Sequence, residues 1–217
     1  MKGDFMNIKV ENISKTIRGV KVLDDISLEF NSGEITGLKG INGSGKTMLM
    51  RTICGLIRPT TGKVIIDGKE LKKDMDFPES IGILIDSPTF LENYSAFDNL
   101  KYLASIKNKV SDEEIKELLD EVNLTEAMYK KFKFYSLGMK QRLGIAGAVL
   151  GHPDVILIDE PTNALDAKGI EIVKRILKRE KERGALIILT CHDYSILKEL
   201  SDKIYFIEEG RIVGHEE

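Results

Sequence analysis

The sequence predicts an α/β protein in which a helical segment interrupts the alternating strands and helices of a parallel sheet. Three observations lead to this prediction: short apolar runs alternate with helical patterns, a glycine-rich stretch joins one such run to a helix, and the periodicity from about residue 95 to 150 is helical. The chain has 217 residues, enough for one large domain or two small ones. We expect a single domain over 1–217, with a core at about 1–88 and 151–217 and a helical subdomain at about 89–150.

The first part of the chain is predicted to be rich in β-strands. Apolar and polar residues alternate in KVLDDISLEF (21–30), where Ile26, Leu28 and Phe30 share one face. Further strands are predicted in NIKVENI (7–13), EITGLKG (34–40), KVIIDGKEL (63–71) and IGILI (81–85). Within KVIIDGKEL, an Asp-Gly pair predicts a tight turn directly after the strand.

The middle of the chain is predicted to be helical, and the alternation of strands and helices then resumes. SDEEIKELLDEV (111–122) begins with a serine cap and a glutamate three residues later, and its apolar residues share one face. After the helical segment, strands are predicted at 154–159, 185–190 and 203–208, with helices between them at about 168–183 and 194–200. Such alternation implies a parallel sheet that is buried on both faces.

Composition and charge exclude several classes of protein. Lys and Arg number 32 against 35 Asp and Glu, so the net charge of −3 argues against a nucleic-acid partner that needs a strongly basic face. The two cysteines, Cys54 and Cys191, predict free thiols rather than a disulfide framework or zinc site. The apolar runs VILI (155–158) and ALIIL (185–189) are far shorter than the about 20 residues of a membrane helix. We therefore expect a soluble protein, with any membrane role exerted through a partner.

A phosphate-binding loop is predicted in GINGSGKT (40–47), which fits the pattern G-x-x-x-x-G-K-[ST]. A predicted strand precedes it and a predicted helix (46–56) follows it, as this motif requires. Its glycines let the backbone approach phosphates, and the helix N-terminus supplies partial positive charge. Lys46 is expected to reach the β- and γ-phosphates and Thr47 to bind Mg²⁺. The expected nucleotide-binding residues of this loop are Asn42, Gly43, Ser44, Gly45, Lys46 and Thr47.

Two acidic residues follow the apolar strand in VILIDEPT (155–162). The strand places Asp159 at the carboxyl edge of the sheet, where such folds bind their ligand, and there Asp159 can hold Mg²⁺ through water. Glu160 points differently and can act as the general base that polarises an attacking water. Together with the loop at 40–47, this pair predicts a nucleoside triphosphatase.

A second anion site is predicted in YSLGMKQRL (135–143), at the N-terminus of a helix that runs to about Leu150. Ser136 and the N–H groups around Gly138 favour an anion. Since residues 40–47 already hold the phosphates of the chain's own nucleotide, we expect this site to contact the γ-phosphate of ATP bound to another subunit. Two chains would then enclose two nucleotides head to tail.

The order of these motifs over the whole chain resembles the nucleotide-binding domain of ABC transporters. The signature differs from the family's LSGGQ at Tyr135, Leu137 and Met139. The resemblance implies a P-loop NTPase fold with an antiparallel N-terminal β part, a RecA-like parallel core and an inserted helical subdomain. It also implies that Asp166, which ends NALD (163–166), acts across a dimer, and that His192 in LTCHD steadies the γ-phosphate and Glu160.

Two further positions depart from the family pattern. Asp86 stands where the family has a glutamine that contacts Mg²⁺ and senses the permease; a carboxylate there can bind the metal but adds negative charge. Ile17 aligns with the aromatic residue that stacks on adenine, and Val22 is assigned to the same binding site. Because Ile17 has no π-face, we expect weak base selectivity, with GTP hydrolysed nearly as well as ATP.

Residues 81–104 together with YSLGMKQRLGIA resemble one subgroup, the ATPases of bacterial exporters that confer resistance to bacitracin and lantibiotic-like peptides. The resemblance implies a homodimer or half of a heterodimer, bound to separately encoded membrane permeases, in the cytoplasm on the inner face of the membrane. Phe90, Tyr94 and Phe97 line a permease groove or belong to the helical core. The alternative is a non-transport ABC ATPase that acts on ribosomes or DNA; a stand-alone kinase or GTPase does not account for YSLGMKQRL.

Overall fold

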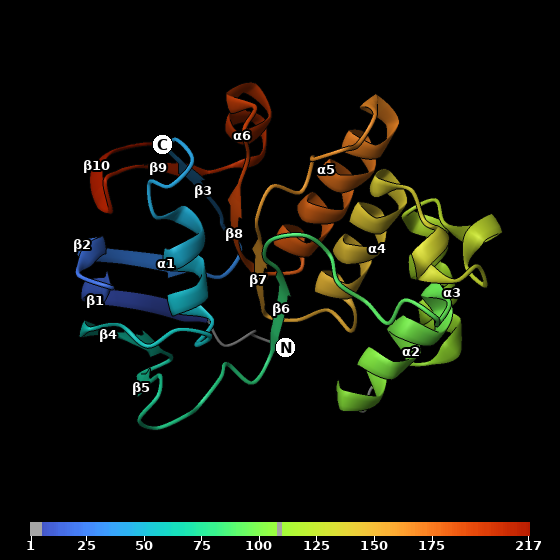
Figure 1. Ribbon diagram of the computed structural model, residues 1–217, viewed down its shortest axis with the longest axis horizontal. Helices are drawn as coiled ribbons and strands as arrows, with labels where there is room; N and C mark the ends of the chain where they lie inside the picture. Colours follow the sequence, from blue (N-terminus) through green and yellow to red (C-terminus); the bar gives the residue numbers. More distant parts are fainter. Residues whose placement is uncertain (1–5, 108–109) are drawn as a thin grey trace.

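The parallel sheet is the central layer of the protein (Figure 1). The computed structural model describes residues 6–107 and 110–217. The strand order of this sheet is β10–β9–β3–β8–β7–β6, and all neighbours are parallel except β9 and β10. The strands are β3 (Ile35–Lys39), β6 (Ile81–Leu84), β7 (Val155–Ile158), β8 (Leu186–Thr190), β9 (Lys203–Glu208) and β10 (Arg211–Glu216). The predicted parallel sheet is thus confirmed.

The N-terminal strands form a separate antiparallel sheet of order β2–β1–β4–β5. Its strands are β1 (Asn7–Ile17), β2 (Val20–Asn31), β4 (Thr61–Ile66) and β5 (Lys69–Glu70). The predicted Asp-Gly turn is present, because Asp67 and Gly68 join β4 to β5 with φ values of 48° and 77°. Positive φ at both positions is what a tight two-residue hairpin demands.

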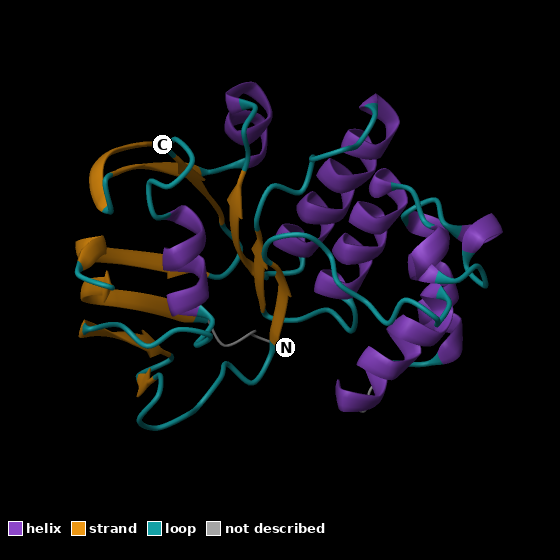
Figure 2. Cartoon of the chain, viewed as in Figure 1, coloured by secondary structure: helices purple, strands orange, loops and turns teal. Residues whose placement is uncertain are grey.

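The helices cover both faces of the parallel sheet (Figure 2). Helix α1 lies between the two sheets, whereas α4 and α5 lie on the opposite face of the parallel sheet, with α2 and α3 beyond α4 (Figure 1). Their bounds are α1 (Lys46–Ile53), α2 (Ala96–Lys107), α3 (Asp112–Glu121), α4 (Leu137–Val149), α5 (Ala167–Glu182) and α6 (Tyr194–Leu200), with short 3₁₀ turns η1 (Thr125–Ala127) and η2 (Phe132–Phe134). Within the described ranges, no helix combines the length and apolar character that crossing a bilayer requires.

Alternate residues of each central strand serve two hydrophobic clusters, as the period of two of a β-strand dictates. Val155 and Leu157 of β7 pack with α1 and the antiparallel sheet. Ile156 and Ile158 pack toward the helices, in a cluster that continues without a break through α4 into α2 and α3. The helical segment therefore shares its core with the parallel sheet. The division into a core and a helical subdomain at 89–150 stays a prediction.

Local sequence explains most element boundaries, with one strand missed. Ser111 begins α3 with a full capping box, because its hydroxyl accepts from the Glu114 N–H while the Glu114 carboxylate accepts from the Ser111 N–H. Strand β10 was not predicted, because its exposed residues do not form an apolar run. It is held by pairing with β9 through a two-residue turn at Glu209 and Gly210, with φ values of 46° and 78°.

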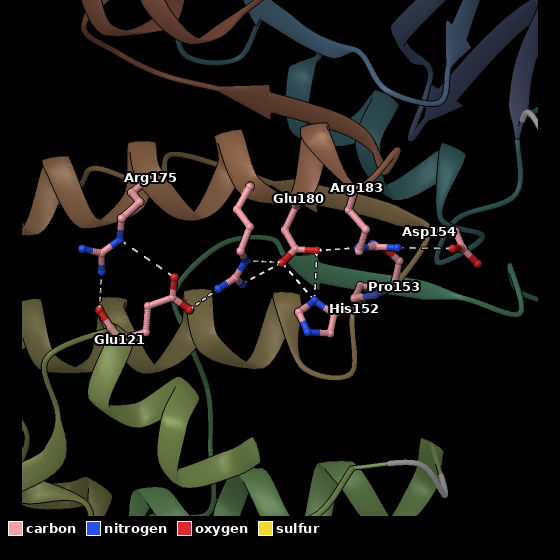
Figure 3. A network of polar contacts seen from close by, with 8 residues as sticks. Glu121, His152, Pro153, Asp154, Arg175, Glu180 and Arg183 are labelled. Carbon is pink, nitrogen blue, oxygen red and sulfur yellow. Dashed lines mark hydrogen bonds and ion pairs between the residues drawn. The ribbon is translucent and has the colours of Figure 1, made fainter. Parts of the chain in front are cut away.

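A network of charged side chains ties α5 to the helical segment and to the loop between α4 and β7 (Figure 3). Its centre is Glu180, which is completely buried. The Glu180 carboxylate accepts hydrogen bonds from Arg179 (2.7 Å) and Arg183 (2.9 Å), and His152 Nδ1 lies 3.1 Å away. Arg179 also pairs with Glu121 at the end of α3. Burial alone raises the pKa of Glu180, but its arginine partners outweigh this effect and hold the pKa below its ordinary value of 4.5.

We predict that Glu180→Gln lowers the free energy of unfolding by about 3 kcal/mol near pH 7, because it leaves two guanidinium groups without their buried partner. The folded-state pKa of Glu180 is depressed, so its contribution is present above pH 4.5 and is lost as the pH falls through the folded value. Urea denaturation at pH 7 and at successively lower pH should show the difference between wild type and variant shrinking. Glu182→Gln, a change of an exposed residue on the same helix, is the control. A difference that does not depend on pH would contradict this account.

Candidate nucleotide site

The predicted phosphate-binding loop connects β3 to α1 and forms one wall of a cavity of about 310 Å³. Gly45 has a φ of 111°, and a Cβ there would lie 3.0 Å from the Val22 carbonyl oxygen, so both conformation and space require glycine. The structure brings predicted residues from four segments together around this cavity, which is lined by Val22, Asn42, Gly43, Gly45, Lys46, Thr47, Met48, Asp159, Glu160 and His192.

Lys46 begins α1 and is almost buried. Its ammonium donates hydrogen bonds to the carbonyl oxygens of Gly40 (2.7 Å) and Ile41 (3.0 Å). Burial lowers its pKa, while the nearby carboxylates of Glu160 and Asp159 favour the charged form. The loop's own carbonyl groups therefore hold this cation at the cavity wall, where it can face a phosphate.

Asp159, at the carboxyl end of β7, has both carboxylate oxygens engaged. The Thr47 hydroxyl donates to one oxygen at 2.6 Å, and the Thr190 hydroxyl donates to the other at 2.6 Å. Hydroxyl and carboxylate oxygens are the ligands that Mg²⁺ prefers, so the adjoining Thr47 and Asp159 fit this metal. Thr190 is not among the residues predicted from the sequence, although its position as the polar last residue of an apolar strand could have indicated it.

Glu160 is held by contacts from two other segments, the end of β8 with the residues that follow it, and α4. Its φ is 53°, an uncommon left-handed value for a residue with a side chain. Its N–H donates to the Thr190 hydroxyl (2.9 Å), and its carbonyl oxygen accepts from Gln141 Nε2 (2.9 Å). The His192 N–H donates to one carboxylate oxygen (2.8 Å), and His192 Nε2 lies 3.7 Å from the other. The predicted base and the predicted histidine are therefore neighbours at the cavity.

Three other residues predicted at this site lie outside the described lining of the cavity. Ser44 is a buried residue of the loop itself. Its Oγ lies close to Gly40, since a Cβ on Gly40 would be 2.4 Å from it. Ile17 ends β1 and is partly exposed. The Asp86 carboxylate forms an ion pair with Arg51 of α1, which offsets the negative charge expected at this position. Direct contact of Ile17 or Asp86 with nucleotide or metal stays a prediction.

Ser136, Gly138 and Asp166 also lie outside the lining of that cavity, as sites for a neighbouring chain would. Ser136 caps α4, and its exposed hydroxyl accepts from the Met139 N–H at 3.3 Å. Asp166 caps α5 by accepting from the Gly169 N–H at 2.8 Å. The helix N-terminus predicted in YSLGMKQRL is therefore present and open to solvent at its cap.

An apolar groove of about 520 Å³ runs between the end of β6, the segment 85–91, α2 and α4. Phe90 lines this groove and also packs edge-on against Phe132, so it belongs to the core of the helical segment, and its contact with a permease stays a prediction. Tyr94 is half exposed and Phe97 packs on the core, and neither is part of the groove lining in the described chain. The rim includes the exposed side chains of Tyr102 and Ile106.

The fold and the cavity define a P-loop ATPase, and sequence comparison assigns it to a family. The family model for ABC transporters matches residues 23–163. YybJ of Bacillus subtilis (strain 168), an uncharacterized ABC transporter ATP-binding protein, is 47% identical over 205 residues, which cover 94% of each chain. The chain therefore belongs to the ABC transporter family, as one of its ATPases.

Two further relatives carry more specific names. The lantibiotic transport ATP-binding protein SrtF of Streptococcus pyogenes is 35% identical, with 97% of this chain and 90% of SrtF covered. The bacitracin transport ATP-binding protein BcrA of Enterococcus faecalis is 36% identical, with 95% of this chain and 68% of BcrA covered. These similarities agree with the subgroup that the sequence resembles.

A solved structure agrees with the fold. The dimeric ATP-binding cassette MJ0796, in a post-hydrolysis state bound to ADP and Pi, superposes with a TM-score of 0.88 at 25% identity. The superposition covers 97% of this chain and 98% of MJ0796. The fold class predicted from the sequence is therefore confirmed.

Proposed function

We propose that this ATPase powers a bacterial ABC exporter for an antimicrobial peptide or drug. The observation that carries the proposal is the convergence of Lys46, Thr47, Asp159, Glu160 and His192 on one cavity. The names of SrtF and BcrA support a peptide antibiotic as the transported class. None of the relatives reported above supports the alternative role on ribosomes or DNA.

Each side chain at the cavity has a proposed role in hydrolysis. Lys46 contacts the β- and γ-phosphates, and Glu160 polarises the attacking water as general base. Thr47 and Asp159 would hold Mg²⁺, the latter through water, with Asp86 as a further ligand, and the metal would neutralise charge on the phosphates. His192 steadies the γ-phosphate and, through its main-chain N–H, the Glu160 carboxylate.

The complete site is proposed to need a second ATPase subunit. Ser136 and Gly138 lie at the exposed N-terminus of α4, away from their own chain's cavity, and are suited to the γ-phosphate held by a partner. Asp166 is the last residue of the loop 163–166, which would communicate across that interface. The dimeric state of MJ0796 supports this arrangement.

We predict that Glu160→Gln binds ATP and dimerises but hydrolyses it at least 100-fold more slowly, because the amide cannot accept a proton from water. Sedimentation in saturating Mg-ATP should show dimers of the variant, and phosphate release should be nearly absent. Glu126→Gln, at an exposed position in η1, is the matched control and should behave as wild type. A Glu160→Gln variant that remains monomeric would refute the head-to-tail dimer.

The apolar groove is the proposed docking site for a separately encoded membrane permease, which would hold this subunit at the cytoplasmic face of the membrane. Its exposed apolar rim fits a short amphipathic segment of such a partner. The groove also adjoins Asp86, the position that the family resemblance assigns to permease sensing.

We predict that Ile106→Glu prevents recovery of the subunit with its permease from detergent-solubilised native membranes, because it places a charge on the apolar rim. The ATPase activity of the isolated subunit should be unchanged. Val213→Glu, on the exposed side of β10, is the control and should leave co-purification intact. Equal recovery of both variants would place the docking surface elsewhere.

Base selectivity is proposed to be weak, because Ile17 offers apolar contact but no aromatic face for the base. We predict that GTP competes with ATP for hydrolysis when the two nucleotides are present at nearly equal concentrations. Ile17→Tyr should shift the preference toward ATP if the side chain reaches the base. A strong preference of the wild-type protein for ATP would contradict this expectation.

A further inference from the structure

Gln141 is a buried polar residue on α4 that has no role in the hydrolysis proposed above. It is the chain's only glutamine. It lies five residues after Ser136, and its side chain is 7% exposed, on a helix whose other buried side chains are apolar. Its Nε2 donates to the Glu160 carbonyl oxygen at 2.9 Å. A buried amide is favourable only where it is hydrogen-bonded, so this contact accounts for the polar residue at this position.

The hydrogen bond from Gln141 acts on a strained stretch of main chain. Glu160 adopts a φ of 53°, which a residue with a Cβ keeps only where its surroundings hold it. Besides a local bond from the Asn163 N–H to its carbonyl oxygen at 3.3 Å, two bonds from other elements hold this residue. Its N–H is bound by Thr190 from β8, and its carbonyl oxygen by Gln141 from α4. The two bonds fix the peptide groups on either side of the Glu160 Cα, and hence the direction in which its side chain leaves the main chain.

A second contact joins α4 to the segment that follows Glu160. A Cβ on Gly138 would lie 2.8 Å from the Ala164 carbonyl oxygen, so the first turn of α4 meets this loop at backbone distance. Ala164 also has a left-handed φ, of 60°. The start of α4 and residues 160–164 are therefore packed as one unit, with Gln141 as its hydrogen-bonded link.

We infer that Gln141 is a positioning residue for the general base, and that it ties the base of one subunit to the helix which that same subunit offers to its partner's ATP. The inference rests on the proposed roles of Glu160 and Ser136. Without the Gln141 amide, the main chain of Glu160 can relax to another conformation. The Glu160 carboxylate is then no longer oriented toward the attacking water. The loop that binds the phosphates is not touched by this change, so nucleotide affinity is retained.

The first test is Gln141→Met, which keeps the length of the side chain and removes the donor. We expect kcat for ATP hydrolysis to fall about 10- to 100-fold, as misplacement of a catalytic group does, with KM within about threefold of wild type. Asn99→Leu is the control: Asn99 is another buried amide bonded to main chain, in α2, and its loss should affect thermal stability but not kcat. A raised KM with unchanged kcat would overturn the inference.

The second test, Gln141→Glu, gives a readout that a purely structural role does not. A carboxylate facing the Glu160 carbonyl repels it, whereas the protonated carboxyl can donate the missing hydrogen bond. Burial raises the pKa of the introduced group toward the assay range. The ratio of the variant's kcat to that of wild type should therefore rise as the pH falls from 8 to 6. A ratio that stays flat would overturn the inference, even if Gln141→Met fails to fold.

Glu160→Gln, assayed in parallel, separates the proposed role of Glu160 as general base from the role of Gln141. If Glu160→Gln hydrolyses ATP as wild type does, the proposed base is wrong and the role of Gln141 falls with it. If Glu160→Gln is inactive while Gln141→Met retains wild-type kcat, the proposed function stands and only the inference about Gln141 is refuted.

Discussion

The buried carboxylate of Asp159 is the interaction on which the nucleotide site depends. A carboxylate that leaves water must be hydrogen-bonded, and here the hydroxyls of Thr47 and Thr190 satisfy one oxygen each. Because the Asp159 carboxylate needs these two hydrogen bonds, the start of α1 and the end of β8 lie next to the end of β7. Thr190 then also accepts from the Glu160 N–H, and His192 follows it by two residues. One constraint thus places the start of α1, the proposed base Glu160 and His192 around a common cavity.

Helix α4 connects this site to the rest of the molecule. Its buried face belongs to the hydrophobic cluster that spans the parallel sheet, α2 and α3. Its N-terminal turn carries Ser136 and contacts the loop after Glu160, while Gly144 and Gly147 line the apolar groove. Because protein interiors are close-packed, a shift of α4 cannot leave the base, the exposed cap and the groove all unchanged. The same helix therefore contacts the proposed base and carries both the proposed dimer contact and part of the proposed permease surface.

A feature could be predicted from the sequence where the residues that form it are close together in the chain. The loop at 40–47 and the acidic pair after β7 are contiguous motifs, and the buried strands are apolar runs, so both were found. Strand β10 was missed, because pairing with β9 rather than apolar content holds it. The hydrogen bond between Gln141 and Glu160 and the contact between His152 and Glu180 join residues that only the tertiary fold brings together. In sequence, Glu180 reads as one more charge on an amphipathic helix.

The ion pair between Arg51 and Asp86 gives the molecule a contact that responds to ionic strength. Asp86 directly precedes Ser87, which lines the groove, while Arg51 belongs to the helix that begins at the phosphate-binding loop. Both side chains are partly exposed, so the pair contributes about 0–1 kcal/mol and is screened over about 8 Å at physiological salt. A linkage this weak can open and re-form at little energetic expense, in contrast to the buried bonds around Asp159. The link that this pair makes between the groove wall and α1 is accordingly weaker at high salt concentration than at low.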